Sequence, residues 1–137
     1  MATLDDVRRL ALALPDTSEK TSWGNQMFRV HGKGFVWERP LRKTDLAEFA
    51  ARGEEPPAGE IIGLRVADET AKAELIAAAP DIYFTIAHFD GYPSVLARLD
   101  AIGDDELAEM ITDAWLDRAP SRLAREFLGA HPEIAGD

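Results

Sequence analysis

The stretch WGNQMFRVHGKGFVWE, residues 23–38, decides the fold. Apolar residues stand two apart on either side of a glycine-rich centre: Phe28 and Val30 before it, Phe35 and Trp37 after it. This spacing places each pair on one face of a β-strand. The central residues His31-Gly32-Lys33-Gly34 supply the positive-φ freedom that a tight reversal needs. The stretch therefore predicts an antiparallel hairpin with one face in a core and the other in water.

The residues before the hairpin predict one amphipathic helix. Thr3 and Asp6 have the spacing of a capping box, and Pro15 ends the helical segment. Between them the apolar residues recur at helical spacing: Leu4, Val7, Leu10, Ala11 and Leu14. Residues 16–22 are polar, and we interpret them as a connection into the hairpin.

The residues after the hairpin predict further short strands and helices. We expect helices over 41–51 with Thr44 as N-cap, 70–79 with Asp68 as N-cap, 103–119 and 121–128, and strands over 61–66, 82–87 and 95–99. The long C-terminal helix carries the apolar stripe Leu107, Met110, Ile111, Ala114 and Trp115. Short strands joined by turns favour one antiparallel α+β domain, with the N- and C-terminal helices packed on one face of a twisted sheet. We expect the domain to span 1–128 and residues 129–137 to form a frayed tail.

Composition restricts the class of protein. A chain of 137 residues, 46% of them hydrophobic, fits a single domain with an ordinary core. It has no cysteine, which removes disulfides, thiolate metal sites and cysteine nucleophiles. No apolar run approaches the roughly 18 residues of a membrane span, and no signal peptide opens the sequence. We therefore expect a soluble, cytoplasmic protein without a membrane partner.

Charge is distributed unevenly along the chain. The formal net charge is −10, which opposes nonspecific attraction to nucleic acid. Residues 20–52, however, hold seven basic and three acidic residues, a net +4, and the remainder holds −14. The candidate nucleic-acid contacts in this region are Lys20, Arg29, Lys33, Arg39, Arg42 and Lys43. These residues fit either a binding patch or a solvated basic face.

Neighbouring aromatic residues leave the same two interpretations open. Trp23, Phe28, Phe35 and Trp37 alternate with these basic residues, an arrangement that can stack bases while phosphates are neutralised. Aromatic residues in such strands also commonly form half-buried sheet core.

Catalytic and metal-binding patterns are weak. His88, Asp90 and Tyr92 form the turn of the second hairpin and are candidate ligand contacts, but no third metal ligand accompanies them. With Ser94 they are too crowded for a hydrolase triad, and residues 32–34 lack the spacing of a phosphate loop. We therefore expect no enzyme activity, no metal and no cofactor.

Three stretches together resemble the MmcQ/YjbR family: LALALPDTSEKTSWGNQMFRVHGKGFVW, IYFTIAHFDGYPSVLARL and ELAEMITDAWLDRAPSRL. The resemblance covers nearly the whole chain in the family's order. It implies a compact, frataxin-like α/β domain with two hairpin wings and a DNA-binding role, and it brings no catalytic residues. The hairpin around Arg29 and Lys33 would be one wing.

The expected function is that of a non-enzymatic binding or regulatory module. Its expected partner is DNA, bound weakly and in a salt-sensitive manner through the basic hairpin 23–39. The alternative is a protein- or small-molecule-binding domain with no nucleic-acid role.

Overall fold

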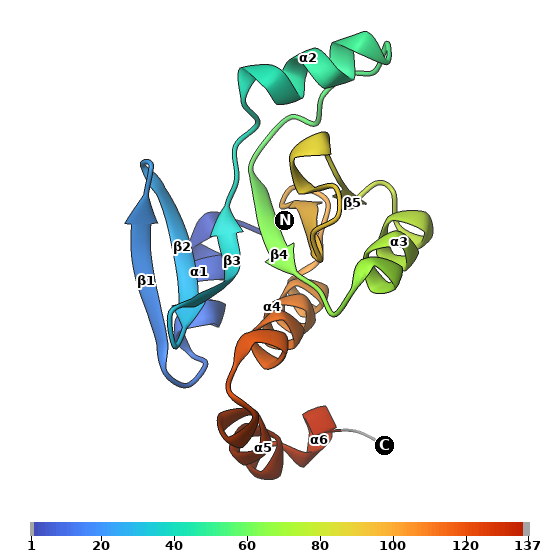
Figure 1. Ribbon diagram of the computed structural model, residues 1–137. Helices are drawn as coiled ribbons and strands as arrows, with labels where there is room; N and C mark the ends of the chain where they lie inside the picture. Colours follow the sequence, from blue (N-terminus) through green and yellow to red (C-terminus); the bar gives the residue numbers. More distant parts are fainter. Residues whose placement is uncertain (1, 136–137) are drawn as a thin grey trace.

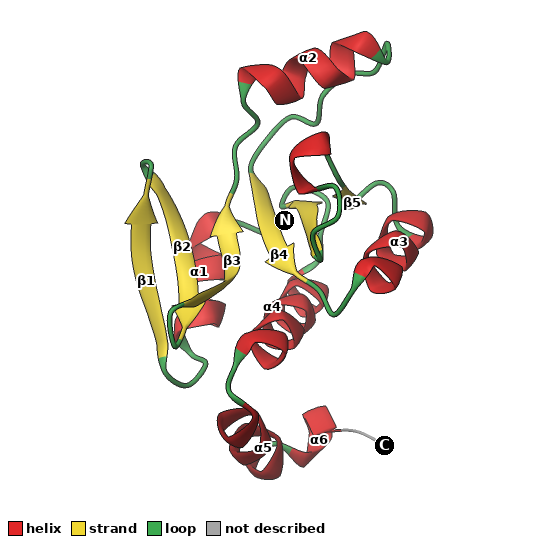
Figure 2. Ribbon diagram, in the orientation of Figure 1, coloured by secondary structure: helices red, strands yellow, loops and turns green. Residues whose placement is uncertain are grey.

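The computed structural model describes residues 2–135, which form an antiparallel six-stranded sheet with helices around it (Figure 1). The helices are α1 (Leu4–Leu12), α2 (Lys43–Ala51), α3 (Glu69–Ala78), α4 (Asp104–Arg118), α5 (Ser121–Ala130) and α6 (Pro132–Ala135). The strands are β1 (Thr17–Ser22), β2 (Asn25–Val30), β3 (Lys33–Glu38), β4 (Ile61–Arg65), β5 (Tyr83–Phe84) and β6 (Ser94–Arg98), and η1 (Ala87–Phe89) is a 3₁₀ turn. Their order in the sheet is β1-β2-β3-β4-β6-β5 (Figure 2). The predicted antiparallel α+β class is confirmed.

The predicted hairpin is present as β2 and β3, but it is part of a three-stranded meander. Residues 17–22, which we interpreted as a polar connection, form β1 and pair with β2 along their whole length. An edge strand with one wet face needs few apolar residues, because its pairing comes from main-chain hydrogen bonds. The turn between β2 and β3 is also shorter than predicted. It consists of His31 and Gly32, while Lys33 and Gly34 belong to β3.

The main core lies between one face of the sheet and helices α1 and α4. Val7 and Ala11 of α1 are buried with Ile111 and Trp115 of α4, as the helical stripes predict. Trp115 is fully buried, and its Nε1 donates a 3.0 Å hydrogen bond to the carbonyl of Pro15. This bond fixes the end of α1 against α4. On this face of the sheet, cross-strand pairing places Phe28, Val36 and Leu64 side by side in one row.

A smaller apolar cluster covers part of the opposite face. It consists of Phe49 from α2 with Ile61, Ile86 and Leu96, joined by Leu41, Phe84 and Phe89. This cluster ends at β4. Beyond it, the outer face of β1–β3 carries no helix, and it faces the viewer in Figure 1, where α1 runs behind the strands.

Several boundaries differ from the predictions. Helix α2 begins one residue after its N-cap Arg42 rather than after Thr44, since the Asp45 side chain accepts from the Arg42 N–H at 2.8 Å. The expected strand 82–87 is reduced to β5 and is followed by η1. The expected tail is helical through α6, and residues 136 and 137 lie outside the described part of the chain. Within residues 2–135, no helix is both long and apolar enough to cross a membrane.

Candidate functional site

A groove of about 290 Å³ lies at one end of the open sheet face. The β1–β2 turn forms one wall, and Arg42 and η1 form the other. It is lined by Ser22, Trp23, Asn25, Gln26, Met27, Trp37, Glu38, Arg39, Arg42, His88 and Phe89. The groove thus joins the predicted basic hairpin to the predicted second turn, two segments about fifty residues apart in the sequence.

Trp23 stands at the tip of the β1–β2 turn and is 94% exposed. It has φ = +53°, and Gly24 after it has φ = +80°, so both positions of this two-residue turn are left-handed. Such turns favour Asn-Gly or Gly-Gly, because a bulky side chain is strained at positive φ. A tryptophan here neither packs in the core nor suits the turn. Stability of the fold therefore does not explain a tryptophan at this position.

The outer face of β1–β3 is basic and apolar. Cross-strand pairing places Lys20, Met27 and Trp37 in one row and Ser18, Arg29 and Gly34 in the next. Neither row contains a carboxylate. Glycines let the large side chains lie flat, because a Cβ on Gly63 would be 2.3 Å from the Trp37 ring and one on Gly34 would be 2.8 Å from Met27 Sδ.

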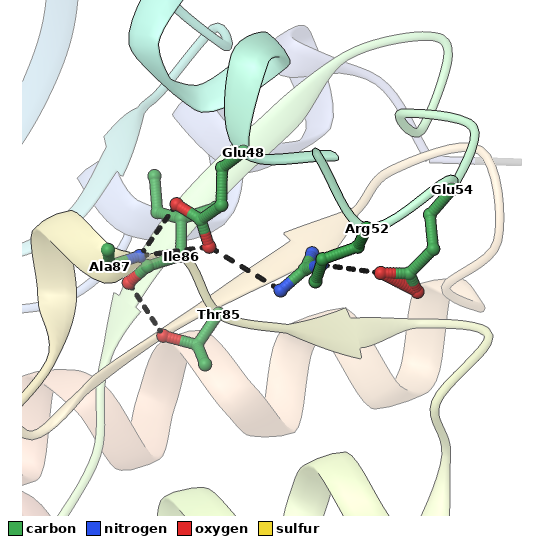
Figure 3. A network of polar contacts seen from close by, with 6 residues as sticks. All are labelled: Glu48, Arg52, Glu54, Thr85, Ile86 and Ala87. Carbon is green, nitrogen blue, oxygen red and sulfur yellow. Dashed lines mark hydrogen bonds and ion pairs between the residues drawn. The ribbon is translucent and has the colours of Figure 1, made fainter. Parts of the chain in front are cut away.

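The second wall of the groove is held by a polar network between α2 and η1 (Figure 3). The Glu48 carboxylate accepts from the Ala87 N–H at 3.1 Å, at the first residue of η1. Arg52 Nη1 lies 3.5 Å from Glu48 Oε2, and Arg52 also pairs with Glu54. Because Ala87 is fixed in this way, the next two residues, His88 and Phe89, are held at the groove.

A buried lysine holds the other end of the same turn. Lys72 of α3 is 4% exposed, and its Nζ donates to the carbonyls of Phe89 at 2.7 Å and Tyr92 at 3.0 Å. The 88–92 turn is thus anchored from two helices, by a carboxylate of α2 and an ammonium group of α3.

Arg39 is not an available phosphate contact. It is 5% exposed, and its Nη1 lies 3.1 Å from the Asp45 carboxylate, which is equally buried. Its guanidinium also lies over the Phe89 ring, 5.6 Å from the ring centre. Proximity to the hairpin predicted a solvent-facing arginine. In the structure, Arg39 is a buried ion-pair partner that supports the back of the groove.

The remaining predicted contacts divide between the groove region and other surfaces. Lys20 and Arg29 lie on the outer sheet face, while Arg42 and the adjacent Lys43 lie at the start of α2. Lys33 follows the opposite turn, at the far end of the hairpin from Trp23.

Of the predicted turn contacts, only His88 lines the groove. Asp90 and Tyr92 are exposed on the loop beyond it. The described residues contain no group of three His, Cys, Asp or Glu side chains placed to hold a metal ion.

The sequence places Trp23 among the strand aromatics, and the site residues predicted from the sequence do not include it. The signal was present as a Trp-Gly pair between a polar segment and the hairpin. This signal is weak, because residues 17–22 show no strand pattern and therefore predict no turn at Trp23.

Comparison with known proteins agrees with this architecture. The YjbR family model matches residues 12–116, from the end of α1 into α4. The chain belongs to the YjbR family. Relatives include the uncharacterised proteins Rv2570 of Mycobacterium tuberculosis and Mb2600 of Mycobacterium bovis. Each is 50% identical over 128 residues, covering 93% of this chain and 97% of the relative.

The crystal structure of Deinococcus radiodurans protein DR2400, with a DUF419 domain, is similar to this YjbR chain at a TM-score of 0.64. The match covers 94% of this chain and 89% of that one at 20% identity. At this identity the similarity concerns the fold, and the groove is assessed from this chain's own residues.

Proposed function

We propose that this YjbR protein is a non-enzymatic binding module. It binds nucleic acid weakly, in the groove and on the outer face of β1–β3. The observation that carries the proposal is Trp23, a strained and almost fully exposed aromatic residue at the mouth of the groove. An exposed indole on a fixed turn offers a flat surface on which an unpaired base can stack.

Single-stranded nucleic acid suits this surface better than a duplex. Stacking on Trp23 requires a base whose face is free, and bases inside a duplex are already stacked. The adjoining basic residues Lys20, Arg29, Arg42 and Lys43 provide up to four phosphate contacts once Arg39 and Lys33 are set aside. Four contacts predict a slope of log K against log salt of about −3.

The net charge of −10 limits the affinity. Repulsion from the acidic remainder of the surface opposes the local basic face, so we expect dissociation constants in the nonspecific range, roughly 10⁻⁴–10⁻⁶ M at physiological salt. Absence of catalysis is part of the proposal. Among the described residues, His88 forms no ion pair with a carboxylate.

The test is a titration of the full chain into a fluorescently labelled oligothymidylate and a duplex of equal length, at two salt concentrations. We expect tighter binding of the single strand and loss of affinity at higher salt. Trp23→Ala is expected to weaken single-strand binding about tenfold, because base stacking on an aromatic residue contributes roughly 1–3 kcal/mol. Trp23→Phe keeps a flat ring and is expected to retain most of the affinity.

Charge variants provide the matched control. Lys20→Ala and Lys33→Ala remove the same charge from the same three-stranded meander, but only Lys20 shares a row with Met27 and Trp37. We expect Lys20→Ala to weaken binding more and to reduce the salt slope. Equal effects of the two substitutions on affinity would mean that binding depends on general electrostatic attraction and not on this row of residues. Binding that ignores both salt and Trp23 would favour the alternative, a protein- or small-molecule-binding module.

A further inference from the structure

A second and larger cleft lies between α3 and α4. Its volume is about 580 Å³, within the range of small-molecule sites. The end of β4 closes it on a third side through Arg65, Val66 and Ala67. None of its lining residues belongs to the hairpin groove.

The walls of this cleft are mostly apolar. They are formed by Val66, Ala67, Ala71, Leu75, Ala78, Met110 and Leu116. Leu75, Met110 and Leu116 pack against the main core and remain partly exposed. The cleft thus offers a continuous apolar surface with small alanines on the α3 side, where an apolar ligand could approach the backbone closely.

Two carboxylates on α4 face this apolar surface without a counter-ion. Asp113 and Asp117 are one helical turn apart and both line the cleft. Neither forms an ion pair or a side-chain hydrogen bond with another described residue. Partial burial raises the pKa of Asp113, helped by Glu109. Partial burial and Asp113 likewise raise the pKa of Asp117, against a smaller opposing effect of Arg65.

The net charge of the lining residues determines whether a positively or a negatively charged ligand fits the cleft. Arg65 is the single cation among the lining residues, against the carboxylates of Glu74, Asp113 and Asp117, a net −2. Arg65 stays beyond ion-pair distance of Asp117, so it leaves the two α4 carboxylates available. An anion entering the cleft would meet three negative groups. A cation would relieve the repulsion between two of them.

We infer that the α3–α4 cleft binds a small organic cation with an apolar body, an alkyl- or arylammonium compound. The ammonium group would lie between Asp113 and Asp117, and the apolar body would cover Leu75 and Leu116. A bare metal ion fits poorly, because the described residues contain no group of three suitable ligands. A second copy of this chain fits poorly as well, since its own charge is −10.

The experiment uses the full ¹⁵N-labelled chain and three probes that share a six-carbon body: n-hexylammonium, hexanol and hexanoate. We expect hexylammonium to shift backbone amide signals of residues 65–67, 71–78 and 110–117 saturably, at lower concentrations than hexanol. Hexanoate is expected to leave them unchanged. Tighter binding of hexanoate, equal binding of hexanol, or no saturable shift would each overturn the inference.

Matched variants test the two carboxylates. Asp113→Asn with Asp117→Asn removes two negative charges from the cleft, while Asp81→Asn with Asp90→Asn removes two from exposed loops outside it. We expect the first pair of substitutions to lower the affinity for hexylammonium about tenfold, because each charge contributes as much as an ordinary surface-exposed ion pair. The second pair is expected to have little effect on this affinity. Equal effects would overturn the inference.

Two further results bear on the same cleft. If a lysine- and leucine-rich helical peptide shifts these amide signals while hexylammonium does not, the cleft is a protein-docking surface and the inference is wrong. Trp23→Ala is expected to leave hexylammonium binding unchanged. The nucleic-acid proposal and this inference can therefore fail separately.

Discussion

Trp115 and Trp23 show two opposite uses of one residue type. Trp115 is fully buried between α4, α1 and the sheet, and its indole N–H is hydrogen-bonded to Pro15. Trp23 is 94% exposed on a left-handed turn, and its indole forms no hydrogen bond with the rest of residues 2–135. The core around Trp115 explains why the chain folds. The turn at Trp23 places a bulky side chain at positive φ without burying it, and this cost in stability motivates the proposed role of Trp23 in binding.

The same contrast separates two kinds of charged residue. Arg39 and Lys72 are buried, but each has close partners: the Asp45 carboxylate and two loop carbonyls, respectively. Asp113 and Asp117 lie at the surface without partners and with raised pKa values. The two buried cations thus have partners for their charged groups, while the two carboxylates of the candidate cleft do not.

The largest expected loss is that of Trp115→Ala. Removing a fully buried indole leaves a cavity and breaks the hydrogen bond to Pro15, at a cost on the order of 3–5 kcal/mol in the free energy of unfolding. Urea denaturation measures it, with Trp115→Phe as a smaller change that keeps most of the apolar volume. An unfolding free energy equal to that of the wild type would place Trp115 outside the core.

The next largest effect is expected from Arg39→Met. The substitution keeps a long apolar side chain but leaves the Asp45 carboxylate buried without its cation, which costs roughly 3 kcal/mol. Adding Asp45→Leu removes the unpaired charge, so the double variant should recover much of the loss in a thermal denaturation experiment. If Arg39→Met is neutral for stability but weakens oligonucleotide binding, Arg39 would be a phosphate contact after all.

The core could be predicted from the sequence because it depends on local periodicity. The stripes of α1 and α4 and the alternation in β2 and β4 require only helical or strand spacing, and they are found. In β3 the predicted alternation is wrong, because the register shifts opposite Phe28 and Arg29: Phe35 and Val36 are both in the core, and Trp37 lies on the outer face with Met27. β1 could not be predicted, because an edge strand of Thr, Ser, Glu and Lys has no apolar pattern and is defined by its partner.

The candidate sites depended on long-range contacts. His88 lies at the groove because Glu48, 39 residues from Ala87, and Lys72 both hold the turn. Arg39 is paired in the interior because α2 brings Asp45 beside it. The α3–α4 cleft requires both helices and the end of β4 together. Spacing along the chain carries no information about any of these.

At the β1–β2 turn, Trp23→Asn is expected to stabilise the protein. Asparagine tolerates the left-handed backbone of the first turn position, and relief of this strain should raise the free energy of unfolding by about 1 kcal/mol. The same change should abolish base stacking. His31→Asn changes the equivalent position of the β2–β3 turn and serves as the control for binding. A lower melting temperature for Trp23→Asn would mean that the indole supports the fold.

The smallest effect, and the one with a distinctive pH dependence, is expected in the α3–α4 cleft. The pKa of Asp117 is raised in the folded protein, above its unfolded value of about 3.9. Between these two values the folded state binds more protons than the unfolded chain, so stability falls as the pH rises through that window. Asp117→Asn should therefore raise the free energy of unfolding at pH 7 by a few tenths of a kcal/mol, because the side chain is partly solvated.

Asp6 provides a control of opposite sign for this last prediction. Its pKa is lowered by hydrogen bonds from Thr3 and from Arg9, so its contribution to stability is present at neutral pH and is lost as the pH falls through the folded value. Asp6→Asn should thus lower the melting temperature at pH 7 and lose this effect in acid, while the gain from Asp117→Asn should also disappear there. If both substitutions destabilise the protein at pH 7, Asp117 belongs with the residues that hold the fold, and the cleft would have no unsatisfied charge to attract a cation.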